Sequence, residues 1–211
     1  VSRTIAQGTS TDWINDDIAT LLAHEEKDYG LKFPLQLLAG SIKGVLGGAS
    51  VAIAGRPDKG KTSLIAFILA HFARQLDQYF APERPILWLN NEGKGQRIVP
   101  RIYQAALGLD MDELVALSNA GVLRERYEAV VGRVDRIRVK DMHGSSFAQI
   151  EQVIEAMNPS VVVWDMMANF RLGSANAGGN KADEIEEKWQ VAREMAVRHD
   201  FVSLGTVQIS N

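Results

Sequence analysis

Short apolar runs alternate with amphipathic stretches along most of the chain. The apolar runs predict strands at residues 50–55, 86–90, 136–140, 161–165 and 201–208. Apolar positions that recur every three or four residues predict helices at about residues 12–26, 61–79, 94–107, 110–132, 146–157 and 181–198. Nearly continuous apolar strands that alternate with helices indicate an α/β fold with a mostly parallel sheet covered by helices on both faces.

Two segments depart from this alternation. Residues 1–11 are polar and irregular, and the amphipathic helix at 12–26 precedes the main core. Residues 171–183 are rich in Gly, Asn and Ala, a composition that favours a flexible loop. We therefore divide the chain into a tail with an amphipathic helix at 1–29 and an α/β domain at 30–211. Because the chain begins with Val1 and ends directly after an apolar run, we expect it to be part of a longer protein.

Composition narrows the classes of function. Of the 211 residues, 46% are hydrophobic and 23% are charged, as in ordinary globular proteins. The absence of cysteine excludes disulfides, zinc–cysteine sites and thiol nucleophiles, and the scattered histidines form no metal-binding pair. With no membrane-length apolar run and no signal peptide pattern, we expect a cytoplasmic protein without membrane contacts. A net charge of −3 leaves only a local basic patch for binding nucleic acid.

The clearest chemical signal is a phosphate-binding loop between a predicted strand and a predicted helix. It comprises Gly55, Arg56, Pro57, Asp58, Lys59, Gly60, Lys61 and Thr62, followed by Ser63, and it matches the pattern G-x-x-x-x-G-K-[ST]. The glycines let successive backbone N–H groups point at phosphate oxygens, and the following helix adds its positive end. In such a loop Lys61 reaches the β- and γ-phosphates and the Thr62 hydroxyl binds Mg²⁺.

Hydrolysis of a nucleoside triphosphate also needs a carboxylate that orients the metal ion and a group that positions or activates water. Asp165 ends the strand 161–165 at the carboxyl edge of the sheet, where we assign it to the magnesium site; the alternative is a capping aspartate. The next residue is Met166. The chain therefore lacks the adjacent Asp-Glu pair with which many P-loop ATPases supply their catalytic base. We therefore assign the catalytic base to Glu92, just beyond the strand 86–90, which we expect to neighbour the phosphate-loop strand; the alternative is a solvent-exposed loop glutamate.

Gln208 is the polar end of the last predicted strand. A glutamine at the carboxyl edge can sense the γ-phosphate by hydrogen bonding. The alternative is an ordinary polar residue where a strand leaves the core, and without the other motifs that alternative would be preferred.

The order of these features resembles the RecA-fold P-loop ATPases, and it is most similar to the DnaB-like hexameric replicative helicases of bacteria and phages. The resemblance covers about residues 30–211 and includes the segment NEGKGQRIVPRIYQAALGLDMDEL, with a Q-R-like pair at Gln96 and Arg97. It implies ATP and Mg²⁺ bound between the subunits of a ring. It also implies catalytic or binding roles for Lys61, Thr62, Glu92, Asp165 and Gln208 as assigned above.

The resemblance implies partners as well. The 171–183 loop would line a central channel and contact single-stranded DNA, and the 12–26 helix would be the linker helix that packs on a neighbouring subunit. The family's arginine finger and second DNA loop would follow Gln208, so we expect the ATPase domain to be incomplete at its carboxyl end. Departures are Met166, Met167 and Ala168 after the aspartate, and a loop whose only cations are Arg171 and Lys181.

Three functions fit these observations. The first is an ATP-hydrolysing motor on single-stranded DNA, a ring-forming, hexameric replicative DNA helicase. The second is a RecA-fold recombinase or regulatory ring ATPase without unwinding activity. The third is a non-enzymatic nucleotide switch, against which the intact set of Lys61, Thr62, Asp165 and Glu92 counts.

Overall fold

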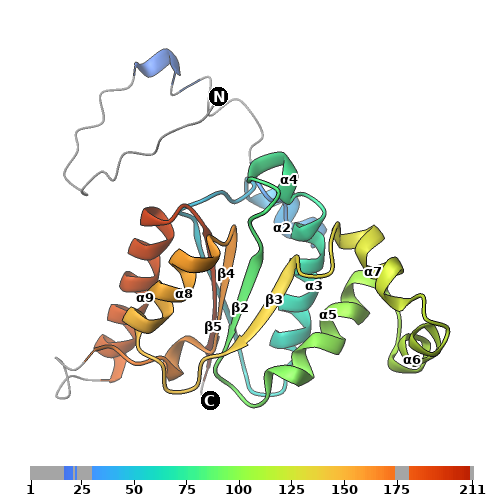
Figure 1. Ribbon diagram of the computed structural model, residues 1–211. Helices are drawn as coiled ribbons and strands as arrows, with labels where there is room; N and C mark the ends of the chain where they lie inside the picture. Colours follow the sequence, from blue (N-terminus) through green and yellow to red (C-terminus); the bar gives the residue numbers. More distant parts are fainter. Residues whose placement is uncertain (1–16, 21, 23–29, 174–180, 210–211) are drawn as a thin grey trace.

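The computed structural model describes residues 17–20, 22, 30–173 and 181–209, and its centre is a parallel β-sheet (Figure 1). The strands are β1 (Ser50–Gly55), β2 (Ile86–Asn90), β3 (Ile137–Asp141), β4 (Val161–Asp165) and β5 (Val202–Gln208). Their order is β1-β5-β4-β2-β3, and every pairing is parallel. The predicted α/β fold is confirmed, and each strand lies within one residue of its predicted bounds.

Helices cover both faces of this sheet. In chain order they are α2 (Gln36–Ser41), α3 (Lys61–Ala73), α4 (Leu76–Tyr79), the 3-10 helix η1 (Gly95–Arg97), α5 (Ile98–Leu107), α6 (Met111–Asn119), α7 (Leu123–Val131), α8 (Phe147–Met157), the 3-10 helix η2 (Met167–Asn169) and α9 (Lys181–Arg198). Figure 1 shows α3 and α5 on one face and α8 and α9 on the other, with α6 and α7 projecting beyond α5. The two faces carry separate hydrophobic cores, as the sequence pattern predicts.

Two long predicted helices are each broken into two. The stretch 61–79 divides at Arg74 and Gln75, and at this break the Gln75 amide pairs with the backbone of Lys32 through bonds of 2.9 and 3.0 Å. The stretch 110–132 divides at Gly121, whose φ of +73° is left-handed and ends helical winding. One break lies at a residue with a partner distant in sequence, and the other lies at a glycine. The apolar periodicity continues across both, so it predicted one longer helix in each case.

Parts of two predicted segments lie outside the described residues. Of the helix at 12–26, residues 17–20 and 22 are described, and residues 18–20 and 22 are helical. Of the loop at 171–183, residues 174–180 lie outside the description. Over the described ranges, no helix combines the length and apolarity that crossing a membrane requires.

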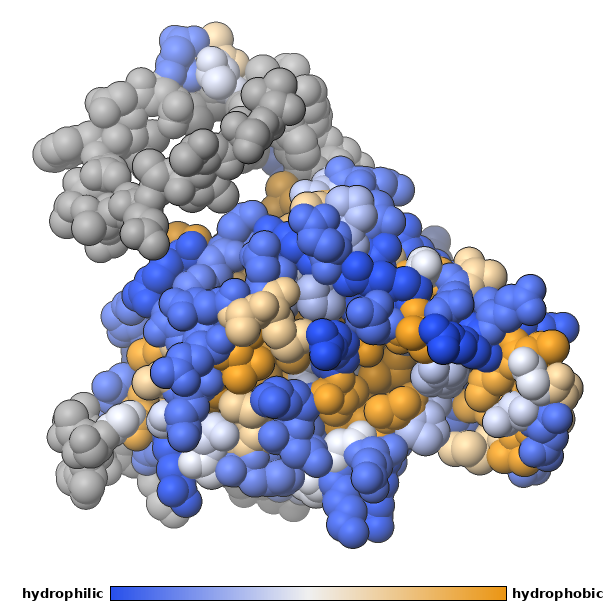
Figure 2. Space-filling view, in the orientation of Figure 1, coloured by the Kyte–Doolittle hydropathy of each residue, from blue (hydrophilic) through white to orange (hydrophobic). Residues whose placement is uncertain are grey.

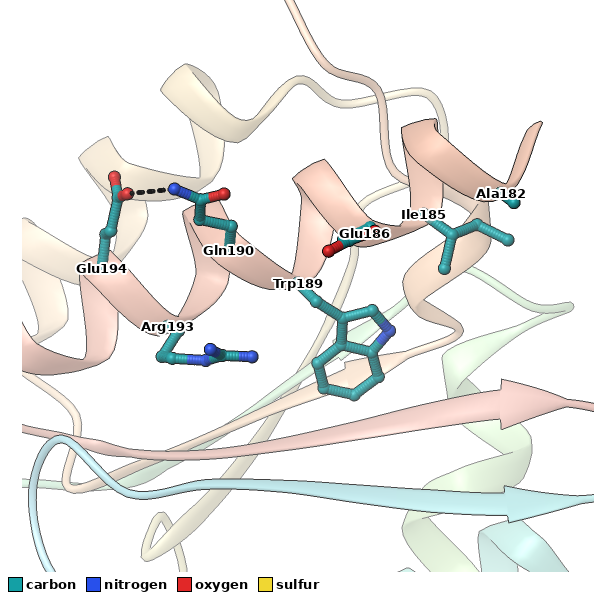
Figure 3. A pocket seen from close by; sticks show the side chains of 7 residues that line it. All are labelled: Ala182, Ile185, Glu186, Trp189, Gln190, Arg193 and Glu194. Atoms are coloured by element: carbon teal, nitrogen blue, oxygen red, sulfur yellow. Dashed lines mark hydrogen bonds between the residues drawn. The ribbon is translucent and has the colours of Figure 1, made fainter. Parts of the chain in front are cut away.

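Burial along the strands follows their place in the sheet. The central strands β2 and β4 are buried at every position, whereas β1, an edge strand, alternates between exposed and half-buried positions. On β5, Gly205 lies directly under the indole ring of Trp189 from α9, and a Cβ atom there would collide with the ring. Figure 3 shows this ring directed from α9 towards the strands.

Candidate functional site

Of the phosphate loop Gly55–Ser63, residues 56–60 form the turn between β1 and α3. Gly60 precedes the helix with a left-handed φ of +79°, and Asp58 has a φ of +54°. The Lys61 ammonium donates hydrogen bonds to the carbonyl oxygens of Gly55 (3.2 Å) and Arg56 (3.0 Å), so the loop curls around its own lysine. The N-cap residue of α3, Gly60, has no side chain that could cap the first turn of the helix. The N–H groups of that turn are therefore available to an anion.

Asp165 lies at the carboxyl end of β4 and is only 3% exposed. Its Oδ1 accepts a hydrogen bond of 2.9 Å from the Thr206 hydroxyl, and its Oδ2 accepts one of 3.2 Å from the indole nitrogen of Trp88. Burial raises the pKa of Asp165 above its ordinary value, although both hydrogen bonds and the positive charges of Lys61 and Arg101 act in the opposite direction. The carboxylate therefore has a fixed orientation and an incompletely compensated charge.

This chemistry fits a magnesium ion. Mg²⁺ prefers hard oxygen ligands, and the two candidate ligands are the Asp165 carboxylate and the Thr62 hydroxyl in the first turn of α3. A cation near Asp165 would compensate the charge that burial disfavours. Thr206 on β5 bonds Asp165, and β5 pairs with β1 up to Gly55, so the phosphate loop and the end of β4 lie at the same edge of the sheet.

Glu92 lies in the turn after β2, and its side chain is exposed. The turn is fixed by Asn90, whose side chain donates to Asp141 and to the Gly93 carbonyl (3.0 Å) and accepts from the Glu92 N–H (3.3 Å). Asp141 also accepts from the N–H of Gly95 at 2.9 Å. The backbone at Glu92 therefore depends on β3 as well as on β2.

The expectation that β2 neighbours the phosphate-loop strand is wrong. Two strands, β5 and β4, lie between β1 and β2, and β2 pairs instead with β4. Asn90 is the register partner of Asp165, so Glu92 follows close beyond the aspartate. The apolar pattern of a strand does not specify its neighbour, because strand order is decided by the path of the crossover helices.

Gln208, at the end of β5, is the register partner of Gly55, the first residue of the phosphate loop. The next residue, Ile209, donates its N–H to the Gly55 carbonyl at 3.2 Å. Gln208 also lines a cavity of about 270 Å³ with Met166, Ile185 and Trp189. The γ-phosphate-sensor candidate is thus joined to the loop through the backbone.

Alternation along the strands explains why these side chains meet. Trp88, Val163 and Leu204 pack in the core with α3. Two residues further along each strand, Asn90, Asp165 and Thr206 emerge on the same face. The carboxyl ends of neighbouring parallel strands bring them to one edge of the sheet.

Several residues at this edge escaped the sequence prediction. Trp88 and Thr206 lie within apolar runs and resemble core residues, yet both bond Asp165. Asn90 and Asp141 end two strands, and this polar strand-end position is the signal that could have identified them. For Asn169, whose amide contacts the turn before Glu92, the sequence offers no comparable signal.

Comparisons with known proteins agree with this geometry. A family model described as AAA domain matches residues 19–210. A search of curated proteins finds no match.

Two solved structures share the fold. The ATPase domain of G40P superposes with a TM-score of 0.69 at 19% identity, over 93% of this chain and 73% of that chain. The second is a structure of a DnaB-like replicative helicase that describes its interactions with primase. It superposes with a TM-score of 0.69 at 20% identity, over 97% of this chain. The chain spans 50% of that helicase. The predicted likeness to the RecA-like ATPase domains of DnaB-like helicases is therefore confirmed at the level of the fold.

Proposed function

The chain belongs to the AAA domain family, and on this premise we propose that it is a magnesium-dependent ATPase and the motor of a ring-forming replicative DNA helicase. The observation that carries the proposal is that the phosphate loop, at the end of β1, and Asp165, at the end of β4, lie at one edge of the sheet and are joined through β5. The fold shared with helicase ATPase domains supports the finer assignment to a helicase.

In this proposal the loop Gly55–Ser63 cradles the phosphates of ATP with its backbone N–H groups, and Lys61 turns from its own loop carbonyls to the β- and γ-phosphates. Thr62 and Asp165 hold Mg²⁺, which supplies neutralising charge when bound. Glu92 accepts a proton from the attacking water. Gln208 senses the γ-phosphate next to Gly55.

We further propose residues 30–211 as the ATPase domain and residues 1–29 as a tail and linker helix. A groove of about 510 Å³ between α5, α6 and α7 is lined in part by exposed apolar side chains. Val99, Met111 and Val115 there are 41%, 47% and 51% exposed. Figure 2 shows hydrophobic residues gathered over these projecting helices. We assign the groove to the 12–26 helix of a neighbouring subunit in a hexameric ring.

Single-stranded DNA would pass through the centre of that ring and contact the 171–183 segment. Binding would rest on phosphate contacts and would weaken steeply with salt. Since the chain carries a net charge of −3, a single copy should bind DNA weakly, and several copies must combine their cations.

A direct test combines electron microscopy with unwinding of a forked duplex in the presence of ATP and Mg²⁺. We expect closed rings and strand separation. Open helical filaments on single-stranded DNA without strand separation would contradict the helicase proposal and favour the second candidate, a recombinase or regulatory ring ATPase. The observation that favours this candidate is the low charge of the 171–183 segment, whose cations are Arg171 and Lys181.

A further inference from the structure

The peptide group that joins Asn91 to Glu92 is held at both ends. Its N–H donates to the side-chain oxygen of Asn90 at 3.3 Å, and its carbonyl oxygen accepts from the side-chain amide of Asn169 at 3.2 Å. A peptide group is planar, so holding both ends sets the orientation of the plane from which the Glu92 Cα departs. These two asparagines therefore act on the direction in which the Glu92 side chain leaves the backbone.

One of the two anchors belongs to the sheet. Asn90 is the last residue of β2 and is fully buried, and its amide is tied to Asp141 at the end of β3. The backbone N–H of Asn91 donates to the Asp165 carbonyl, which ties the same turn to β4. This side of the turn is fixed by the central strands.

The other anchor belongs to a short segment that leans on α9. Asn169 ends η2, the 3-10 turn that follows β4, and its neighbour Ala168 accepts a hydrogen bond of 2.8 Å from the Lys188 ammonium. The Lys188 side chain is 4% exposed and is paired with Glu184 at 2.7 Å. A buried lysine is costly unless it is paired and hydrogen-bonded, so this contact fixes η2 against α9.

We propose that Asn169 is a positioning residue for Glu92 and that Lys188 holds η2 in place for this task. The inference rests on the proposed ATPase function, and it adds a regulatory path to the same site. A shift of the first turns of α9 reaches Glu92 through Glu184, Lys188 and η2.

The experiment measures steady-state ATP hydrolysis by the full chain and its Asn169→Ala variant. We expect kcat to fall about fivefold to tenfold, because one lost hydrogen bond loosens a base that must meet its water within a fraction of an ångström. KM for ATP and the affinity for ADP should change less than about twofold, since Asn169 bonds the turn and not the phosphate loop. Because Asn169 is exposed, the variant is expected to fold normally.

Further variants separate positioning from general damage. Asn169→Asp keeps the shape but loses the N–H donor, so it should lose as much kcat as alanine, whereas Asn169→Gln keeps the donor and should recover part of it. Lys188→Met should also lower kcat, and the double variant with Asn169→Ala should lose little more than one single variant. Gln190→Ala is the matched control on α9, because its amide donates to Glu194 on the same helix, as Figure 3 shows.

Each outcome decides between the claims. Equal loss in the aspartate and alanine variants, with KM retained and a non-additive double variant, supports the inference. An unchanged kcat in Asn169→Ala beside a Glu92→Gln variant that loses turnover overturns the inference and leaves the ATPase proposal standing. A full chain without any nucleotide hydrolysis, with or without single-stranded DNA, overturns both.

Discussion

The phosphate loop and the turn that carries Glu92 lie at the same edge of the sheet, but they are held in different ways. The loop is one continuous stretch, Gly55–Ser63, and its lysine bonds the loop's own carbonyls. The turn is held by Asn90, Asp141 and Asn169, which come from three elements distant in sequence. A local motif thus forms one half of the candidate site, and tertiary packing assembles the other.

The largest effect is expected from Lys61→Ala, in the local half. Removing the ammonium that we propose to bind the β- and γ-phosphates should lower ATP hydrolysis by about a thousandfold, as the loss of a preorganised charge does in other active sites. Hydrolysis and nucleotide binding are measured together. Lys43→Ala, at an exposed lysine outside the loop, serves as the control. Activity retained by Lys61→Ala would refute the assignment of the phosphate loop.

Glu92→Gln comes next and tests the assembled half. A glutamine cannot accept the proton from water, so turnover should fall about a hundredfold while nucleotide binding persists. We expect the variant to hydrolyse ATP slowly and to bind a fluorescent nucleotide with the affinity of the unmodified protein. Glu83→Gln, at another exposed glutamate, is the matched control. Near-normal hydrolysis by Glu92→Gln would remove this residue from the mechanism.

Thr206→Val probes the boundary between the two halves. In the native protein the Thr206 hydroxyl donates a hydrogen bond that stabilises ionised Asp165. Losing this bond should raise the pKa of Asp165 further above its ordinary value. The acid limb of the profile of kcat/KM against pH should therefore move to higher pH, and the free energy of unfolding should fall by about 1 kcal/mol.

Ser203→Ala is the control for this variant, because it removes a buried hydroxyl from β5 that bonds Trp164 on the other face. It should destabilise the fold by a similar amount without moving the acid limb. A limb that stays in place in Thr206→Val would mean that Thr206 does not influence the ionisation of Asp165.

The smallest effect is expected far from both halves, at Glu151. Burial raises the pKa of this carboxyl, but the hydrogen bond from His199 and the charge of Arg198 outweigh it, and the net pKa is lowered. A lowered pKa gives stability above the unfolded value of about 4.3, lost as the pH falls through the folded pKa. Glu151→Gln should cost about 0.5 kcal/mol at pH 7 and nothing at pH 2.5, with ATP hydrolysis unchanged. Equal melting temperatures of the two proteins at pH 7 would contradict this.

The strands and the phosphate loop could be predicted because each depends on consecutive residues. The helix breaks at Gln75 and Gly121, and the contacts of Trp88 and Thr206 with Asp165, could not, because apolar periodicity places a side chain on a face but does not name its partner. The position of β2 beside β4 was missed for the same reason, since strand order follows from the crossovers. The pattern of apolar and polar positions therefore does not show which distant polar groups meet at the edge of the sheet.

The close packing of Trp189 on Gly205 gives the protein an intrinsic optical reporter. Of the tryptophans within the described residues, Trp88 and Trp164 are 0% exposed, whereas Trp189 is half-buried and lines the same cavity as Gln208. Its emission depends on how far β5 and η2 admit water to the indole ring. A shift of its fluorescence on adding nucleotide would follow the end of β5 in solution, without any attached dye.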